Sequence, residues 1–268
     1  MISLYYRSVL LTIATALCFE AMATSDTEIN IRFHGGADFS YVNERASLHG
    51  NGTFELESYS PFPFLIEQNI VGTFRHLPSA NPYQNFATEA QSLFKLKRSA
   101  PAVTNDSVIG ELSFKGSESK KGIVWPAGYF KAAAKIESAY DRMKKDVKAF
   151  PVMAMVLDCQ RSAKKIDCFL KNIGTQEIRT IDPLGMPGSV VCLTSAFKRT
   201  ALNPGDGYDP REMKPKRIVI KAKDSFRFSL DDAGLCGDHI LISTSGLAIN
   251  PTYRDDFLAE MISNKISR

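Results

Sequence analysis

The chain has 268 residues, which leaves room for one large domain or two modest ones, and either can bury a hydrophobic core. It carries 33 lysine and arginine residues against 29 aspartate and glutamate residues, so its formal net charge at pH 7 is +4. This balance is only mildly basic. Together with the export pattern at the N-terminus, it argues against nucleic acid as a partner.

Residues 1–23 predict a cleavable export signal and are set aside from the fold. Arg7 precedes an uncharged, mostly apolar run over residues 8–19, and Ala21 and Ala23 fit the small-x-small pattern before a cleavage site. The run is shorter than the roughly 20 residues that a membrane-spanning helix needs. We therefore expect cleavage near Ala23, no transmembrane segment in the mature chain, and a periplasmic or secreted location.

Residues 24–150 predict an α+β region that begins with strands. Polar and apolar residues alternate strictly over residues 28–33, as in a strand with one buried face. Within residues 46–56, Asn51 and Gly52 favour the tight turn of a β-hairpin. Apolar residues at helical spacing then predict a short helix over residues 66–77.

A longer helix is expected at the end of this region, and we interpret it as the link to the second half. Apolar residues recur at steps of three and four between Trp125 and about Lys148, and Pro151 stops the pattern. Residues 79–121, by contrast, show no clear periodicity. The predicted boundary between the halves therefore falls at residue 150.

Residues 151–268 predict a run of short strands separated by turns rich in glycine, proline and asparagine. The strands are expected at residues 152–158, 166–172, 177–181, 190–195, 217–222, 225–230 and 239–244. With the turn at Asn172-Ile173-Gly174 after the second strand, this segment resembles an immunoglobulin-like antiparallel β-sandwich, although it lacks the tryptophan of antibody-type domains. An amphipathic stretch around Met261 and Ile262 predicts a short terminal helix. The fold class is thus α+β and mainly β.

Four cysteines remain once the export signal and its Cys18 are removed, namely Cys159, Cys168, Cys192 and Cys236. In an oxidising compartment this even number favours two disulfides, for which three connectivities are possible. We favour Cys159 with Cys168 and Cys192 with Cys236, because the first two lie in successive predicted strands. The absence of any C-x-x-C pair and the scattered histidines argue against a zinc site.

Motifs for catalysis and for cofactor binding are missing from the sequence. It contains no G-x-S-x-G nucleophile elbow, no phosphate-cradling loop and no dinucleotide fingerprint. The carboxylate pairs Glu55/Glu57 and Asp231/Asp232 have the spacing of ordinary strand-face and turn residues. The sequence therefore predicts no catalytic residue, no metal and no cofactor.

An apolar loop between two predicted strands is one candidate contact site. It carries Leu184 and Met186 and is stiffened by Pro187, so it could dock on a partner with little ordering cost. The alternative is that it packs across the end of the sandwich.

Two further sets of residues are candidates for binding. Lys216, Arg217 and Lys221 belong to a basic stripe that could attract an anionic envelope component, unless it is simply a solvated strand face. Trp125 could belong to an exposed aromatic platform, or it could pack at the joint between the halves.

These observations predict a non-enzymatic extracytoplasmic protein that recognises another protein or an envelope component. One alternative is an inhibitor or immunity-type protein whose loop over residues 182–188 blocks a secreted enzyme. A second alternative is a hydrolase whose site lies between the two halves and is assembled from residues far apart in sequence.

Overall fold

The computed structural model describes residues 28–36, 42–59, 68–95, 107–115, 122–128, 130–162, 164–186, 188–194, 198–202, 216–232, 236–244 and 259–266. The predicted export signal, residues 1–23, lies outside them. The described fold is mainly β, as expected, and its strands form antiparallel sheets.

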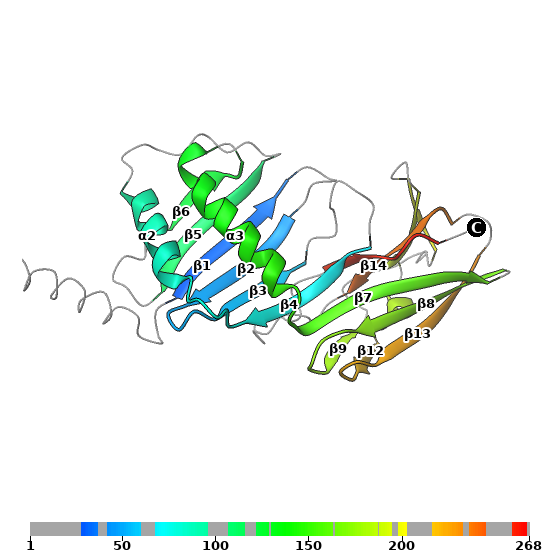
Figure 1. The fold of residues 1–268 in the computed structure, drawn as a ribbon. Coiled ribbons are helices and arrows are strands. Elements are labelled where there is room, and N and C mark those ends of the chain that lie inside the picture. Colours follow the sequence, from blue (N-terminus) through cyan, green and yellow to red (C-terminus); the bar gives the residue numbers. More distant parts are fainter. Residues whose placement is uncertain are drawn as a thin grey trace, which may run out of the picture.

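A nine-stranded antiparallel sheet runs the length of the molecule (Figure 1). Its strand order is β13-β8-β7-β4-β3-β2-β1-β5-β6. In chain order the strands are β1 (Glu28–Gly35), β2 (Val42–His49), β3 (Phe54–Ser58), β4 (Ile70–His76), β5 (Val108–Lys115), β6 (Ile123–Pro126), β7 (Pro151–Ser162), β8 (Lys165–Asn172) and β13 (Ser225–Asp231).

Two α-helices cover one face of the N-terminal part of this sheet (Figure 1). They are α2 (Tyr83–Phe94) and α3 (Ala134–Val147), and α3 follows a single 3-10 turn, η1 (Lys131–Ala133). Ile136 of α3 and Leu93 of α2 pack with Ile29 and Ile31 of β1 in one buried cluster. The alternation along β1 therefore gives one face to the helices and leaves the polar side chains on the other.

Two smaller sheets complete the C-terminal part. The first has the order β11-β10-β14-β15 and the second pairs β12 with β9. Their strands are β9 (Ile178–Ile181), β10 (Val190–Leu193), β11 (Arg199–Ala201), β12 (Arg217–Ile220), β14 (His239–Thr244) and β15 (Ala259–Ile262), and η2 (Pro183–Gly185) is a 3-10 turn after β9. One apolar cluster joins all three sheets, through Leu157 of β7, Ile220 of β12 and Ile240 of β14.

Both expected disulfides are present. Cys159 and Cys168 are direct cross-strand partners on β7 and β8, with their Cα atoms 4.1 Å apart. Cys192 of β10 is bonded to Cys236, just before β14, across a sequence separation of 44. All four cysteines belong to the C-terminal core.

Two helices predicted from apolar spacing are wrong. The segment predicted as a helix over residues 66–77 contains strand β4, which is paired on both sides, with β3 and with β7. Residues 71–74 are all buried, so this strand shows consecutive buried positions instead of alternation. At the C-terminus, Met261 and Ile262 lie on strand β15, which pairs with β14.

The main sheet continues through the predicted boundary at residue 150, because β4 pairs with β7. Val71 of β4 belongs to the C-terminal core, whereas Ala154 of β7 belongs to the N-terminal one. The division into two domains stays a prediction. Among the helices of the described part of the chain, none is both long and apolar enough to cross a membrane.

Candidate functional site

The ribbon formed by β9 and β12 has one buried face and one exposed face. Ile178 and Ile220 are direct cross-strand partners, and both are buried in the C-terminal core. Their neighbours Arg179 and Val219 are also paired and are exposed, Val219 with 57% of its surface accessible. Alternation along two short strands thus presents a valine and an arginine side by side to solvent.

The loop after β9 is held by its own hydrogen bonds. The Asp182 carboxylate accepts from the Leu184 backbone N–H at 3.0 Å. The Ser189 hydroxyl lies 2.5 Å from the carbonyl oxygens of Pro183 and Met186 and donates toward them. Leu184 remains 45% exposed at the surface of this loop, while Met186 is half-buried.

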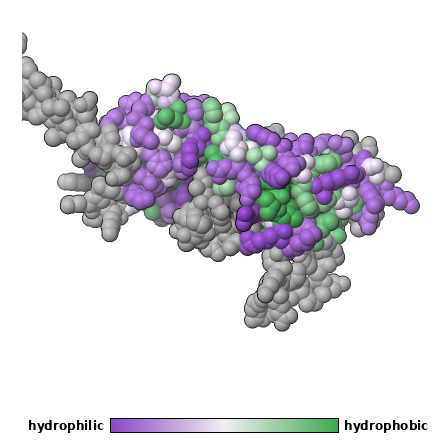
Figure 2. Space-filling view, turned by 90° about the horizontal axis from the view of Figure 1, so that it is seen from below, coloured by the Kyte–Doolittle hydropathy of each residue, from purple (hydrophilic) through white to green (hydrophobic). Residues whose placement is uncertain are grey.

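The structure brings the loop together with the basic residues of β12 and its two flanking positions. The Asp182 N–H donates to the Lys216 carbonyl at 2.8 Å, and the Lys216 ammonium lies 3.1 Å from the Asp182 carboxylate. Lys216, Arg217 and Lys221 are all exposed. We use the name β12 surface for Arg179, Leu184, Lys216, Arg217, Val219 and Lys221. Figure 2 views the molecule from below and shows apolar side chains bordered by hydrophilic ones over the C-terminal part.

Trp125 lies elsewhere and is fully buried. It belongs to β6, the strand at the end of the main sheet farthest from β13, so the expected position at the joint between the halves is wrong. Its indole N–H donates to the Glu137 carboxylate of α3 at 2.7 Å, and its ring packs edge-on against Phe33. This partner on α3 allows the tryptophan to pack in the N-terminal core, where it does not form an exposed platform.

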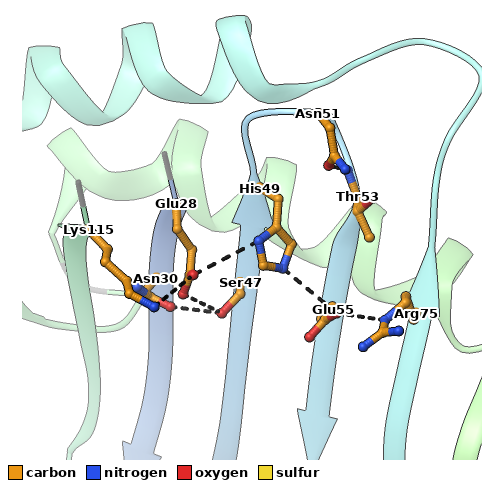
Figure 3. A network of polar contacts seen from close by, with 9 residues as sticks. All are labelled: Glu28, Asn30, Ser47, His49, Asn51, Thr53, Glu55, Arg75 and Lys115. Atoms are coloured by element: carbon orange, nitrogen blue, oxygen red, sulfur yellow. Dashed lines mark hydrogen bonds and ion pairs between the residues drawn. The ribbon is translucent and has the colours of Figure 1, made fainter. Parts of the chain in front are cut away.

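The face of the N-terminal sheet opposite the helices is polar, a feature that the sequence analysis did not single out. In Figure 3 the labelled side chains stand on this face, in front of the strands, with the helices behind. Ser47 donates to Asn30 at 2.8 Å, and Arg75 pairs with Glu55 at 2.6 Å. His49 lies between the carboxylates of Glu28 and Glu55, at 3.9 and 3.8 Å. The alternation of polar and apolar residues along these strands is the sequence pattern that could have indicated this polar face.

A groove is hollowed into this polar face. It measures about 230 Å³ and is lined by Asn30, Ile31, Arg32, Arg45, Glu111 and Ser113. These residues come from the three adjacent strands β2, β1 and β5. Strands β1 and β5 are about 80 residues apart in the chain, and their pairing register brings these side chains together.

No family model, no curated protein and no solved structure matches the chain. Function is therefore inferred from the geometry of the molecule itself.

A buried polar network under α3 is a separate feature. The Glu44 carboxylate accepts from the Tyr140 hydroxyl at 3.0 Å, from the Ser58 hydroxyl at 3.1 Å and from the Lys144 ammonium at 2.6 Å. Burial, and then the negative charge of Glu44, raise the pKa of Tyr140 well above its ordinary value. Glu44 is 4% exposed, so this network lies away from both open surfaces and serves packing.

Within the described ranges, no group of three or more histidine, cysteine, aspartate or glutamate side chains is arranged to hold a metal ion.

Proposed function

We propose that this protein is a non-enzymatic binding protein of an extracytoplasmic compartment and that it recognises another protein through the β12 surface. The observation that carries the proposal is the exposure of Leu184 and Val219, at 45% and 57%, beside the cations of β12. Large apolar side chains gain more from contact with a partner than from contact with water. The surrounding positive charges favour a partner that is acidic at its rim.

The scaffold beneath this surface supports the same proposal. Ile178 and Ile220 fix the ribbon to the core, and the two disulfides restrain the sheets against which it packs. A surface that is already ordered loses little conformational entropy when it binds. The disulfides also support an oxidising compartment, in agreement with the export pattern at residues 1–23.

A finer description of the C-terminal part belongs to this proposal. We infer an immunoglobulin-like sandwich for residues 151–268, in which the small sheets pack over the β7, β8 and β13 part of the main sheet. The shared apolar cluster supports this arrangement. In such folds binding loops project from a rigid double sheet.

An inhibitor or immunity-type protein is the second candidate, and the loop over residues 182–188 favours it. The side chain of Asp182 and the hydroxyl of Ser189 bond to the backbone of residues 183, 184 and 186 of this loop, while Leu184 stays exposed. A preformed loop of this kind can occupy the cleft of an enzyme with a small ordering cost.

The test is affinity capture from an envelope extract with the mature protein, residues 24–268. Wild-type protein should recover a partner, and Leu184→Ser combined with Val219→Ser should lose it. Leu77→Ser is the matched control, because Leu77 is also an exposed apolar residue, at 61%, and lies on the N-terminal part. Equal recovery by the double variant would exclude the β12 surface. If the partner is an enzyme, a fall in its activity on binding would select the inhibitor.

A further inference from the structure

The groove on the polar face of the N-terminal sheet holds two arginines side by side. Arg32 of β1 and Arg45 of β2 are direct cross-strand partners, so their side chains leave the same face of the sheet next to one another. Like charges in this position destabilise a strand pair. Glu111, opposite Arg32 on β5, and Glu57, opposite Arg45 on β3, offset part of this cost. An anion placed between the two guanidinium groups would offset more of it.

The donors of Arg32 are incompletely used. Its Nε is shielded from solvent and has no acceptor among the described residues. Its Nη1 lies 3.8 Å from the Glu111 carboxylate, which is beyond hydrogen-bond distance. The Arg32 side chain is 38% exposed, so the open part of this guanidinium group has donors for a further oxygen atom.

Glu111 gives the groove a second kind of contact. It lies opposite Arg32 on β5, on the side away from Arg45, and one of its oxygens is 3.0 Å from His34 Nε2. Together Arg32, Arg45 and Glu111 give the lining a charge of +1. The groove therefore offers two guanidinium groups at one end and a carboxylate at the other.

We propose that this groove binds a small carboxylate that carries an amino group on the neighbouring carbon, such as a free α-amino acid. The ligand carboxylate lies between Arg32 and Arg45, where forked guanidinium donors match its two oxygens. The ammonium group faces Glu111, and the Asn30 amide and Ser113 hydroxyl supply neutral polar contacts. A volume of about 230 Å³ suits a ligand of this size. A dianion such as phosphate is disfavoured, because Glu111 would repel it.

The experiment is isothermal titration of the mature protein with a panel of α-amino acids, with acetate and with inorganic phosphate. At least one amino acid should bind with one site per chain and more tightly than acetate. Arg32→Gln should weaken that binding about tenfold or more, because charge-assisted bonds are lost. Glu111→Gln should weaken binding of the amino acid and should leave binding of acetate unchanged or slightly tighter.

Arg75→Gln is the matched control. Arg75 stands on the same sheet face but is already paired with Glu55, at 2.6 Å, and does not line the groove. This variant should bind as the wild type does. Unfolding curves of each variant establish that it is folded. If Arg32→Gln does not fold, Arg32→Lys is used in its place. The Ser113 amide resonance of the wild type is then followed by NMR as the ligand is added. A resonance that does not move would refute the site.

Several outcomes would overturn the proposal. They are binding of phosphate alone, binding of no amino acid, and equal binding by wild type and Arg32→Gln. The result is independent of the β12 surface, which is formed by the C-terminal part. The Leu184 and Val219 variants should lose partner capture and still bind the amino acid. The Arg32 variant should lose amino acid binding and still capture the partner.

Discussion

The N-terminal region, β1 to β6 with its helices, and the C-terminal region, β7 to β15, are stabilised in different ways. In the first, strands of up to eight residues pack under two helices, around large side chains such as Trp125 and Phe74. In the second, the two small sheets have strands of three to six residues, and the disulfide of Cys192 with Cys236 restrains one of them, while the other disulfide joins the longer strands β7 and β8.

The difference teaches how a chain compensates for short strands. A short strand offers few ladder hydrogen bonds and buries little apolar surface, so the small sheet that contains Cys192 gains more from covalent restraint of the unfolded state. The N-terminal region instead uses helix packing and the buried Glu44 network. The regions should therefore respond differently to reduction, whereas strain at their junction and alkaline pH should act on both.

The largest effect is expected from removing the disulfide with the longer loop. Replacing Cys192 and Cys236 by alanine should lower the free energy of unfolding by about 4 kcal/mol, from the loop-closure entropy of a 44-residue separation. Hydrogen exchange should rise in β10 and β14 well before it rises in α3. Equal loss of protection in both regions would show that they form one cooperative unit.

The next largest effect on stability is expected from backbone strain at the junction of β4 with β7. Gly72 of β4 has a φ of +139°, and a Cβ there would collide with the Met153 carbonyl of β7. Gly72→Ala should therefore cost about 3 kcal/mol in chemical denaturation, by combining overpacking with backbone strain. Gly128→Ala is the control, since Gly128 also has a positive φ, of +77°, but a Cβ there meets nothing within 4 Å. If both variants lose the same stability, the close approach of β4 to β7 contributes nothing.

Alkaline pH should act on one buried tyrosine in each core. Burial, and then a nearby glutamate, raise the pKa of Tyr140 in the N-terminal core and of Tyr59 in the C-terminal core above the ordinary value of 10.0. The folded state keeps these protons while the unfolded chain releases them, so stability is complete below pH 10.0 and falls as the pH rises above it.

Tyr140→Phe should cost about 2 kcal/mol at neutral pH, because Glu44 loses a hydrogen bond. The same variant should also flatten the fall in stability above pH 10.0, measured as urea denaturation at several pH values. Tyr59→Phe should flatten it as well. An unchanged slope in Tyr140→Phe would contradict the raised pKa.

The smallest effect is expected at the β12 surface. Leu184→Ser and Val219→Ser should each change the free energy of unfolding by no more than about 0.5 kcal/mol, because both side chains are largely exposed. A thermal unfolding midpoint close to that of the wild type would check this. A larger loss would indicate that these side chains pack against the protein itself, and it would weaken their assignment to partner binding.

The sequence was informative where structure is local. Strands β7 to β10 and β12 to β14 lie at the expected places because alternation and turn residues act over a few positions, and the cysteine pairing followed from neighbouring strands. The helix expected over residues 66–77 was wrong because β4 is covered on both faces, which removes the alternation that identifies a strand. Helix α2 was missed, although its buried residues recur at helical spacing from Tyr83 to Leu93.

The candidate sites show the same limit. Leu184 and Lys216 were singled out separately, but their proximity depends on β9 pairing with β12 across more than 30 residues. Trp125 was placed at the junction because strand β6 could not be recognised. The groove needs the registers of β2, β1 and β5, which alternation alone does not determine.

The pairing of β4 with β7 has a consequence for the order in which the protein matures. As the chain emerges from its N-terminal end, β4 is the free border of the sheet until β7 arrives, and it presents Ile70 and Val71 with unpaired backbone groups. A truncated product that ends near residue 150 would keep this border open. Nascent chains of this protein should thus need a chaperone most while β7 is still being synthesised.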